Sequence, residues 1–105
     1  MTTARELPER AAPTLRAILT EEELAATRTR VTRQAQPFQK LQDREVLADQ
    51  DPLDDATVLE VHTLGEACGI WFNGREQPNE TVERIHSDLQ DFVAESRFGW
   101  GQLRP

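Results

Sequence analysis

This chain of 105 residues contains a single cysteine and no long apolar run. Its one cysteine, Cys68, has no partner for an intramolecular disulfide, which favours a reducing compartment. No apolar run approaches the roughly 20 residues of a membrane-spanning helix, and the first residues lack the apolar segment of a secretory signal. We therefore expect a cytoplasmic protein that has no membrane partner.

Residue sets that carry chemistry are missing as well. No glycine-rich loop has the spacing of a phosphate-binding motif, and residues 83–86 give a lone Glu-x-x-His, whereas a di-metal site needs a pair of them. Cys68 and His62 flank one predicted turn, but no third group that would orient a catalytic pair is evident. Residues 49–55 form an acidic loop that contains Pro52 and lacks the glycine of a calcium loop. We therefore expect no enzymatic activity, no metal and no cofactor.

Negative charge is concentrated in the second half of the chain. Residues 1–50 hold eight basic and eight acidic side chains, whereas residues 51–105 hold four basic and eleven acidic ones, which accounts for the whole net charge of −7. Such a surface keeps a protein soluble, favours basic partners and repels phosphate backbones.

One basic segment runs against this trend. No acid lies between Leu24 and Gln42, and the basic side chains there are Arg28, Arg30, Arg33 and Lys40. Two interpretations follow from this composition. The segment, taken as residues 28–44, could hold the phosphates of a nucleic acid, or it could dock on the acidic half of the protein, within one chain or between two.

The first residues predict an arm followed by a helix. Residues 1–12 are polar and contain Pro8, so we expect a flexible N-terminal arm there and a single domain over residues 13–105. Pro13 fits the first turn of a short helix, because its missing N–H has no partner at that position. The apolar side of this helix is formed by Leu15, Ile18 and Leu19.

A second helix is expected to follow. Thr20 and Glu23 have the spacing of a capping box, in which each side chain bonds the backbone amide of the other residue. We expect the helix to run from Glu21 to about Gln36, with a thin apolar side that must lean on the sheet or on another chain. Residues 44–48 could form a short strand or continue the helix, and of these we favour the strand; residues 49–55 predict a loop.

Alternating residues predict a β-hairpin in the second half. Residues 57–63 alternate between two faces, of which one holds Leu59 and Val61 and the other holds Val58, Glu60 and His62. After a turn at residues 65–69, Trp71 takes the face opposite to Ile70 and Phe72.

An amphipathic helix is predicted after the hairpin. Asn79 is a good N-cap, and Gly99 supplies a left-handed stop. The apolar stripe of this helix consists of Val82, Ile85, Leu89, Phe92 and Val93. Burial of such side chains is worth about 1.5–3 kcal/mol each before entropy, so we expect this helix to be the main anchor of the fold.

These elements predict an α+β fold, with N-terminal helices, a small antiparallel sheet of two or three strands, and the C-terminal amphipathic helix packed on it. We expect a small acidic protein that acts by protein–protein interaction, such as an inhibitor, an immunity-type protein, or a phage-accessory or other regulatory protein. Its partner is then another protein or a second copy of the chain. The expected contact residues are Trp71, Asp88, Asp91, Glu95 and Trp100. The alternative is a nucleic-acid-associated protein that uses residues 28–44.

Overall fold

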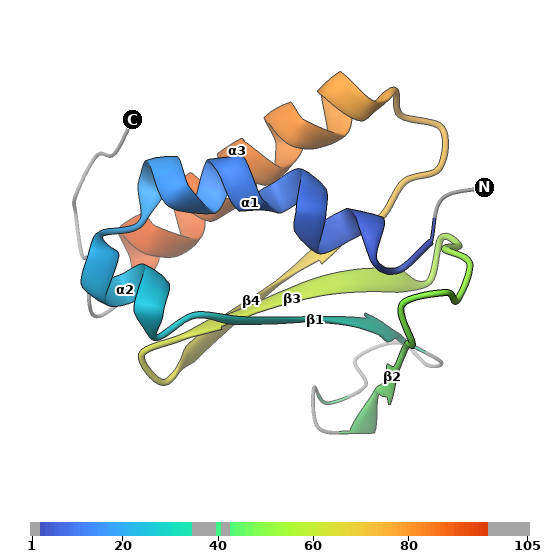
Figure 1. Cartoon of the computed structure of the whole chain (residues 1–105), viewed down its shortest axis with the longest axis horizontal. Coiled ribbons are helices and arrows are strands. Elements are labelled where there is room, and N and C mark those ends of the chain that lie inside the picture. Colours follow the sequence, from blue (N-terminus) through green and yellow to red (C-terminus); the bar gives the residue numbers. More distant parts are fainter. Residues whose placement is uncertain (1–2, 35–39, 41–42, 97–105) are drawn as a thin grey trace.

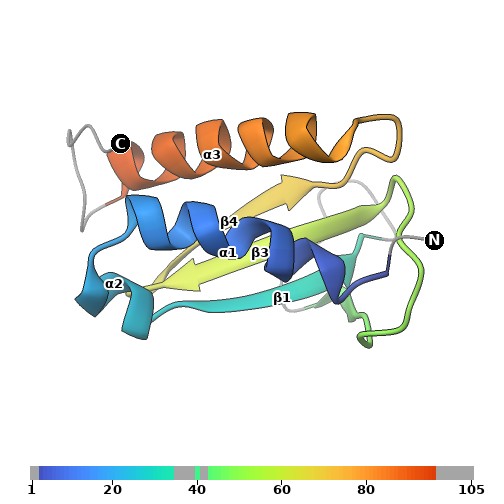
Figure 2. The same cartoon turned by 45° about the horizontal axis from the view of Figure 1, so that its top comes forward.

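Two long helices lie on one face of a four-stranded sheet in the computed structural model of the chain (Figure 1 and Figure 2). The structure describes residues 3–34, 40 and 43–96. In chain order its elements are α1 (Glu6–Ile18), α2 (Glu21–Ala25), β1 (Arg28–Arg33), β2 (Glu45–Val46), β3 (Thr57–Thr63), β4 (Glu66–Trp71) and α3 (Pro78–Glu95). The α+β class is therefore confirmed, but the antiparallel sheet has four strands rather than two or three.

Strand β1 lies where a helix was expected. The sheet order is β2-β1-β3-β4, and β1 pairs with β3 along its whole length, with Val31 opposite Leu59. The predicted capping box is confirmed: Thr20 Oγ1 accepts from the Glu23 amide at 3.2 Å, and the Glu23 carboxylate accepts from the Thr20 amide at 3.0 Å. The helix that it starts ends at Ala25. The prediction of a helix to Gln36 was wrong because β-branched residues alternate with arginine after this point and pair readily in a sheet.

Residues 3–12 belong to the fold rather than to a flexible arm. Helix α1 includes Leu7, which is buried, and the Ala4 amide donates to the Asp51 carbonyl at 2.8 Å. Pro13 accordingly lies inside the helix and not in its first turn. The arm was predicted from polar composition, but apolar residues at helical spacing give this segment a side that packs into the core.

The core lies between the sheet and the two long helices. Figure 2 shows α1 and α3 side by side above the strands. The predicted stripe of α3 is confirmed at its centre, where Ile85, Leu89 and Val93 are buried, while Val82 and Phe92 at its margins are half-buried. The helix-facing side of the sheet supplies Val31, Leu59, Val61 and Ile70 to the same core.

The start of α3 differs by two residues from the prediction. The helix begins at Pro78, and the Gln77 amide donates to the Glu80 carboxylate at 3.0 Å, so Gln77 rather than Asn79 is the N-cap. Gly99, the expected stop, lies outside the described residues. None of the described helices has the length and apolar character needed to cross a membrane.

The predicted hairpin is confirmed, but its turn is tighter than expected. The turn consists of Leu64 and Gly65, whose φ angles of 49° and 81° are those of a type I′ turn. Strand β4 therefore starts at Glu66, within the segment expected to be a turn. The short strand predicted over residues 44–48 is confirmed as β2, and a loop follows it.

Candidate functional site

The sheet face away from the helices contains a buried carboxylate, that of Glu60. Its side chain is 0% exposed and lies directly opposite Arg30, whose Nε is 2.6 Å from Glu60 Oε1. His62 Nε2 lies 2.9 Å from the same oxygen, and Thr32 Oγ1 donates to Oε2 at 2.9 Å. Arg44, which precedes β2, brings its Nη1 to 3.6 Å from Oε2. These contacts tie β1, β3 and the chain before β2 together.

Burial and hydrogen bonding act in opposite directions on the pKa of Glu60. Burial raises this pKa, but the hydrogen bonds from Arg30, His62 and Thr32 outweigh it, so that the pKa lies below its ordinary value of 4.5. The carboxylate is therefore ionised at neutral pH. Gly69, its neighbour on β4, leaves room for Val58, because a Cβ at this position would lie only 3.0 Å from Val58 Cγ1.

The basic residues predicted to form a patch are divided between the two faces of β1. Strand alternation puts Arg28 and Arg30 on the face away from the helices and Arg33 on the other, whereas a helix would have put Arg30 and Arg33 together. Arg30 is held by the buried carboxylate, and Arg33 Nε lies 3.1 Å from Asp54 Oδ2. Lys40 is exposed. For Arg30 and Arg33, docking on the acidic half of the same chain is thus observed.

The two residues weighed as a catalytic pair are not brought together. Cys68 packs toward the helices, whereas His62 lies on the opposite face of the sheet. Burial, and then the Asp88 carboxylate, raise the pKa of the Cys68 thiol to about 12, so the thiol stays protonated at neutral pH. In the part of the chain that the structure describes, no three His, Cys, Asp or Glu side chains are grouped to hold a metal ion.

A groove runs between β4 and α3. Its volume is about 360 Å³, and it is lined by Ala67, Cys68 and Gly69 on the strand side and by Phe92 on the helix side. The helix side contributes the carboxylates Asp88, Asp91 and Glu95. Three of the five predicted contact residues therefore line one groove. We refer to β4, together with the part of α3 that carries these three acids, as the β4 side.

The outer edge of β4 has backbone groups that face away from the sheet. The Phe72 amide donates to the Thr57 carbonyl at 2.9 Å, so Phe72 directs its backbone toward β3. Because backbone direction alternates along an antiparallel strand, Ala67, Gly69 and Trp71 direct their N–H and C=O groups outward. β4 is the last strand of the sheet, and all three of these residues are exposed.

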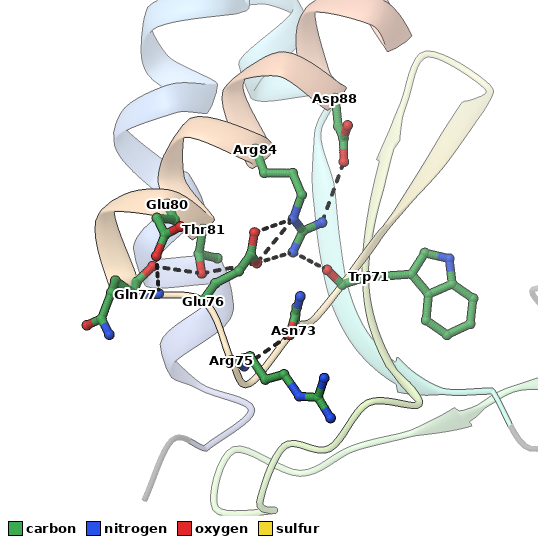
Figure 3. A network of polar contacts seen from close by, with 9 residues as sticks. All are labelled: Trp71, Asn73, Arg75, Glu76, Gln77, Glu80, Thr81, Arg84 and Asp88. Carbon is green, nitrogen blue, oxygen red and sulfur yellow. Dashed lines mark hydrogen bonds and ion pairs between the residues drawn. The ribbon is translucent and has the colours of Figure 1, made fainter.

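An arginine of α3 covers the end of this edge. Figure 3 shows the Arg84 guanidinium between the Glu76 carboxylate and the Trp71 carbonyl oxygen, to which Arg84 Nη2 donates. Arg84 Nε lies 2.9 Å from Glu76 Oε2, and Nη1 lies 3.7 Å from Asp88 Oδ2. The hydrogen bond from Arg84 lowers the pKa of Glu76. The network fixes the loop before α3 and leaves Ala67 as well as Gly69 uncovered on the outer edge.

The predicted contact residues thus have three outcomes. Asp88, Asp91 and Glu95 line the groove. Trp71, which is 48% exposed, ends the adjacent strand, and its indole points away from α3 (Figure 3). Trp100 lies outside the described residues. The chain matches no protein-family model, no curated protein and no solved structure. A functional proposal therefore depends on the geometry of its own residues.

Proposed function

We propose that this chain acts by protein–protein interaction and that the β4 side is its contact surface. The observation that carries the proposal is the convergence of an exposed strand edge, an acid-lined groove and a half-exposed tryptophan on one side of the molecule. Each of these features is common at interfaces, but their coincidence along β4 and the adjacent part of α3 is what favours a contact surface here.

Trp71 supports the proposal because it is a rigid apolar anchor. Its backbone is held in β4 opposite Val58, and its carbonyl is fixed by Arg84, so covering the indole costs little backbone entropy and restricts only two side-chain torsions. Tryptophan is enriched among the residues that dominate binding energy at interfaces. The exposed ring is therefore the best single candidate for such a residue on the β4 side.

The proposal is tested with the tagged full-length chain purified from the cells that encode it. We expect a specific protein to co-purify, and calorimetry with that purified protein should give saturable binding that Trp71→Ala weakens by about tenfold or more. Val46→Ala is the matched control, since Val46 is also an exposed apolar residue but lies at the opposite edge of the sheet.

Two outcomes would contradict the proposal. One is that the chain retains no protein beyond what an unrelated acidic domain retains. The other is retention of nucleic acid that is lost with Arg28→Ala and Lys40→Ala together, which would favour the alternative based on residues 28–44.

A further inference from the structure

We infer that the partner supplies an extended basic segment that adds to β4 as a fifth strand. This inference rests on the proposed function and specifies the chemistry of the partner. It requires that the β4 side has free backbone groups on the strand edge and unpaired negative charge beside that edge. It also requires that this surface disfavours a second copy of the chain.

The backbone groups of the edge are available. In the described part of the chain, nothing hydrogen-bonds the outward N–H and C=O groups of Ala67 and Gly69. Edge strands are usually protected by lysine, by proline or by a bulge, whereas residues 66–71 contain neither lysine nor proline and pair with β3 in an unbroken register. An edge strand that lacks these three protections is the surface to which an extended peptide adds.

The charge beside the edge selects a basic segment. A strand paired with β4 would place every second side chain on the helix side, next to the groove that holds the carboxylates. Asp91 and Glu95 are exposed, and neither has an ion-pair partner among the described residues. Lysine or arginine at alternate positions of the incoming strand would therefore meet uncompensated negative charge.

The opposite side of the incoming strand meets a different surface. There it would lie beside Ala67 and Gly69, which are small, and next to the exposed indole of Trp71. This surface accommodates apolar side chains and offers them an aromatic contact. The preferred segment therefore alternates basic with apolar residues over about the length of β4, which is six residues.

A second copy of this chain does not fit the same edge. Pairing β4 with its own copy would bring the Asp88, Asp91 and Glu95 carboxylates of both molecules to one interface. Like charges placed opposite one another disfavour the wrong partner. The charge of the groove thus distinguishes a basic strand from an identical one.

To test the inference, peptides that bind the full-length chain at low salt are selected from a random library displayed on phage. We expect enriched peptides in which lysine or arginine alternates with apolar residues. A synthetic copy of an enriched peptide should bind by fluorescence anisotropy, more weakly at high salt. Methylation of alternate backbone nitrogens in that peptide should lower its affinity by about tenfold or more, because the strand pairing needs those N–H groups.

Two pairs of protein variants separate charge from backbone pairing. Neutralising the groove with Asp88→Asn, Asp91→Asn and Glu95→Gln should lower the affinity for the peptide by about tenfold. The charge-matched control, with the same number of neutralised carboxylates elsewhere, is Glu22→Gln, Asp55→Asn and Glu83→Gln, and it should bind as the wild type does. Ala67→Pro removes an outward N–H without breaking a bond to β3 and should abolish binding, whereas Ala67→Thr keeps that N–H and should retain it.

Several results would overturn the inference. These are enriched peptides without alternating basic residues, equal binding of the methylated peptide, or a dimer of the chain that Ala67→Pro dissociates. If Ala67→Pro does not fold, as judged by circular dichroism, the affinity of the methylated peptide for the wild type still tests whether backbone pairing is needed. A co-purified partner whose binding depends on Trp71, but which binds the groove variant and its charge-matched control equally, would leave the proposed function intact and contradict only the addition of a fifth strand.

Discussion

Replacement of Glu60 by glutamine tests whether the buried carboxylate holds the sheet together. Glu60→Gln keeps the size of the side chain but removes the charge that faces Arg30 and Arg44. It also places an amide N–H₂ among groups that donate to the carboxylate, such as Thr32 Oγ1. We expect both effects to destabilise the folded state, because each leaves a donor without an acceptor.

The expected magnitude follows from the burial of each partner. Removing one member of a buried ion pair costs about 3–5 kcal/mol. Because the Arg30 and His62 side chains remain 35% and 37% exposed, water compensates part of the loss. We therefore expect about 3 kcal/mol for Glu60→Gln. In a domain of this size, that loss corresponds to a fall in Tm on the order of 15 °C.

Urea unfolding followed by circular dichroism measures the effect. The matched control is Glu45→Gln, which removes a carboxylate 3.5 Å from Arg33 on the same sheet but one that is 65% exposed. This control should cost no more than about 0.5 kcal/mol. If Glu60→Gln and the wild type unfold at the same urea concentration, the carboxylate does not stabilise the sheet and the reasoning fails.

The pH dependence gives an independent check on Glu60. Its pKa in the folded protein lies below the ordinary 4.5, so its stabilisation is fully present above that pH. The stabilisation is lost as the pH falls through the folded-state pKa. The difference in unfolding free energy between the wild type and Glu60→Gln should therefore narrow on acidification. A difference that widens below pH 4.5 would refute this assignment.

Three further predictions concern other parts of the fold. Leu64→Asn should stabilise the protein by about 0.5–1 kcal/mol, measured as a higher urea midpoint, because Leu64 has a φ of 49° that asparagine tolerates better. Cys68 should react with iodoacetamide at pH 8 far more slowly in the folded than in the urea-unfolded chain, since its thiol pKa is raised to about 12; equal rates would contradict this. Leu89→Ala should cost about 3 kcal/mol, while Asp91→Ala, on the exposed side of the same helix, should change stability by less than about 0.5 kcal/mol.

The elements that were predicted correctly have local signals. Residues 59–62 alternate between apolar and polar side chains, and the stripe of α3 follows helical spacing, so each pattern indicates the face that packs against the core. The second face of β3 is buried as well, which this alternation does not indicate. The capping box at Thr20 is also a local signal, because both of its hydrogen bonds join residues three apart. Such patterns require no knowledge of the rest of the chain.

Strand β1 shows where a correct local signal misled. The capping box predicted where α2 begins, but it contained no information on where the helix ends. Residues 27–31 alternate arginine with threonine and valine, and Thr32 adds a further β-branched side chain, which is the pattern of a strand. Weighing that β-branched content against the thin apolar side of the proposed helix would have favoured the strand.

The candidate site was predictable only in part. Asp88, Asp91 and Glu95 fall on one side of a helix because they are spaced by three and four residues, so their clustering could be expected from the sequence. That β4 is an edge strand could not, because strand order depends on the pairing of β1 with β3, far apart in the sequence. The burial of Glu60 depends on the same pairing, since Arg30 faces it from β1.

The acids beside β4 link partner choice to protection against self-association. Burial raises the pKa of Asp88, Arg84 opposes this, and the Asp91 and Glu76 carboxylates raise it further, so the groove already disfavours additional negative charge. A second acidic edge would increase that repulsion, whereas a cationic strand would relieve it. Neutralising Asp88, Asp91 and Glu95 should therefore weaken binding of the basic peptide. In the same variant, sedimentation velocity at rising protein concentration should show increased self-association. Loss of peptide binding without any change in sedimentation would show that something other than charge protects the edge of β4, because an unprotected edge strand is a template for another chain.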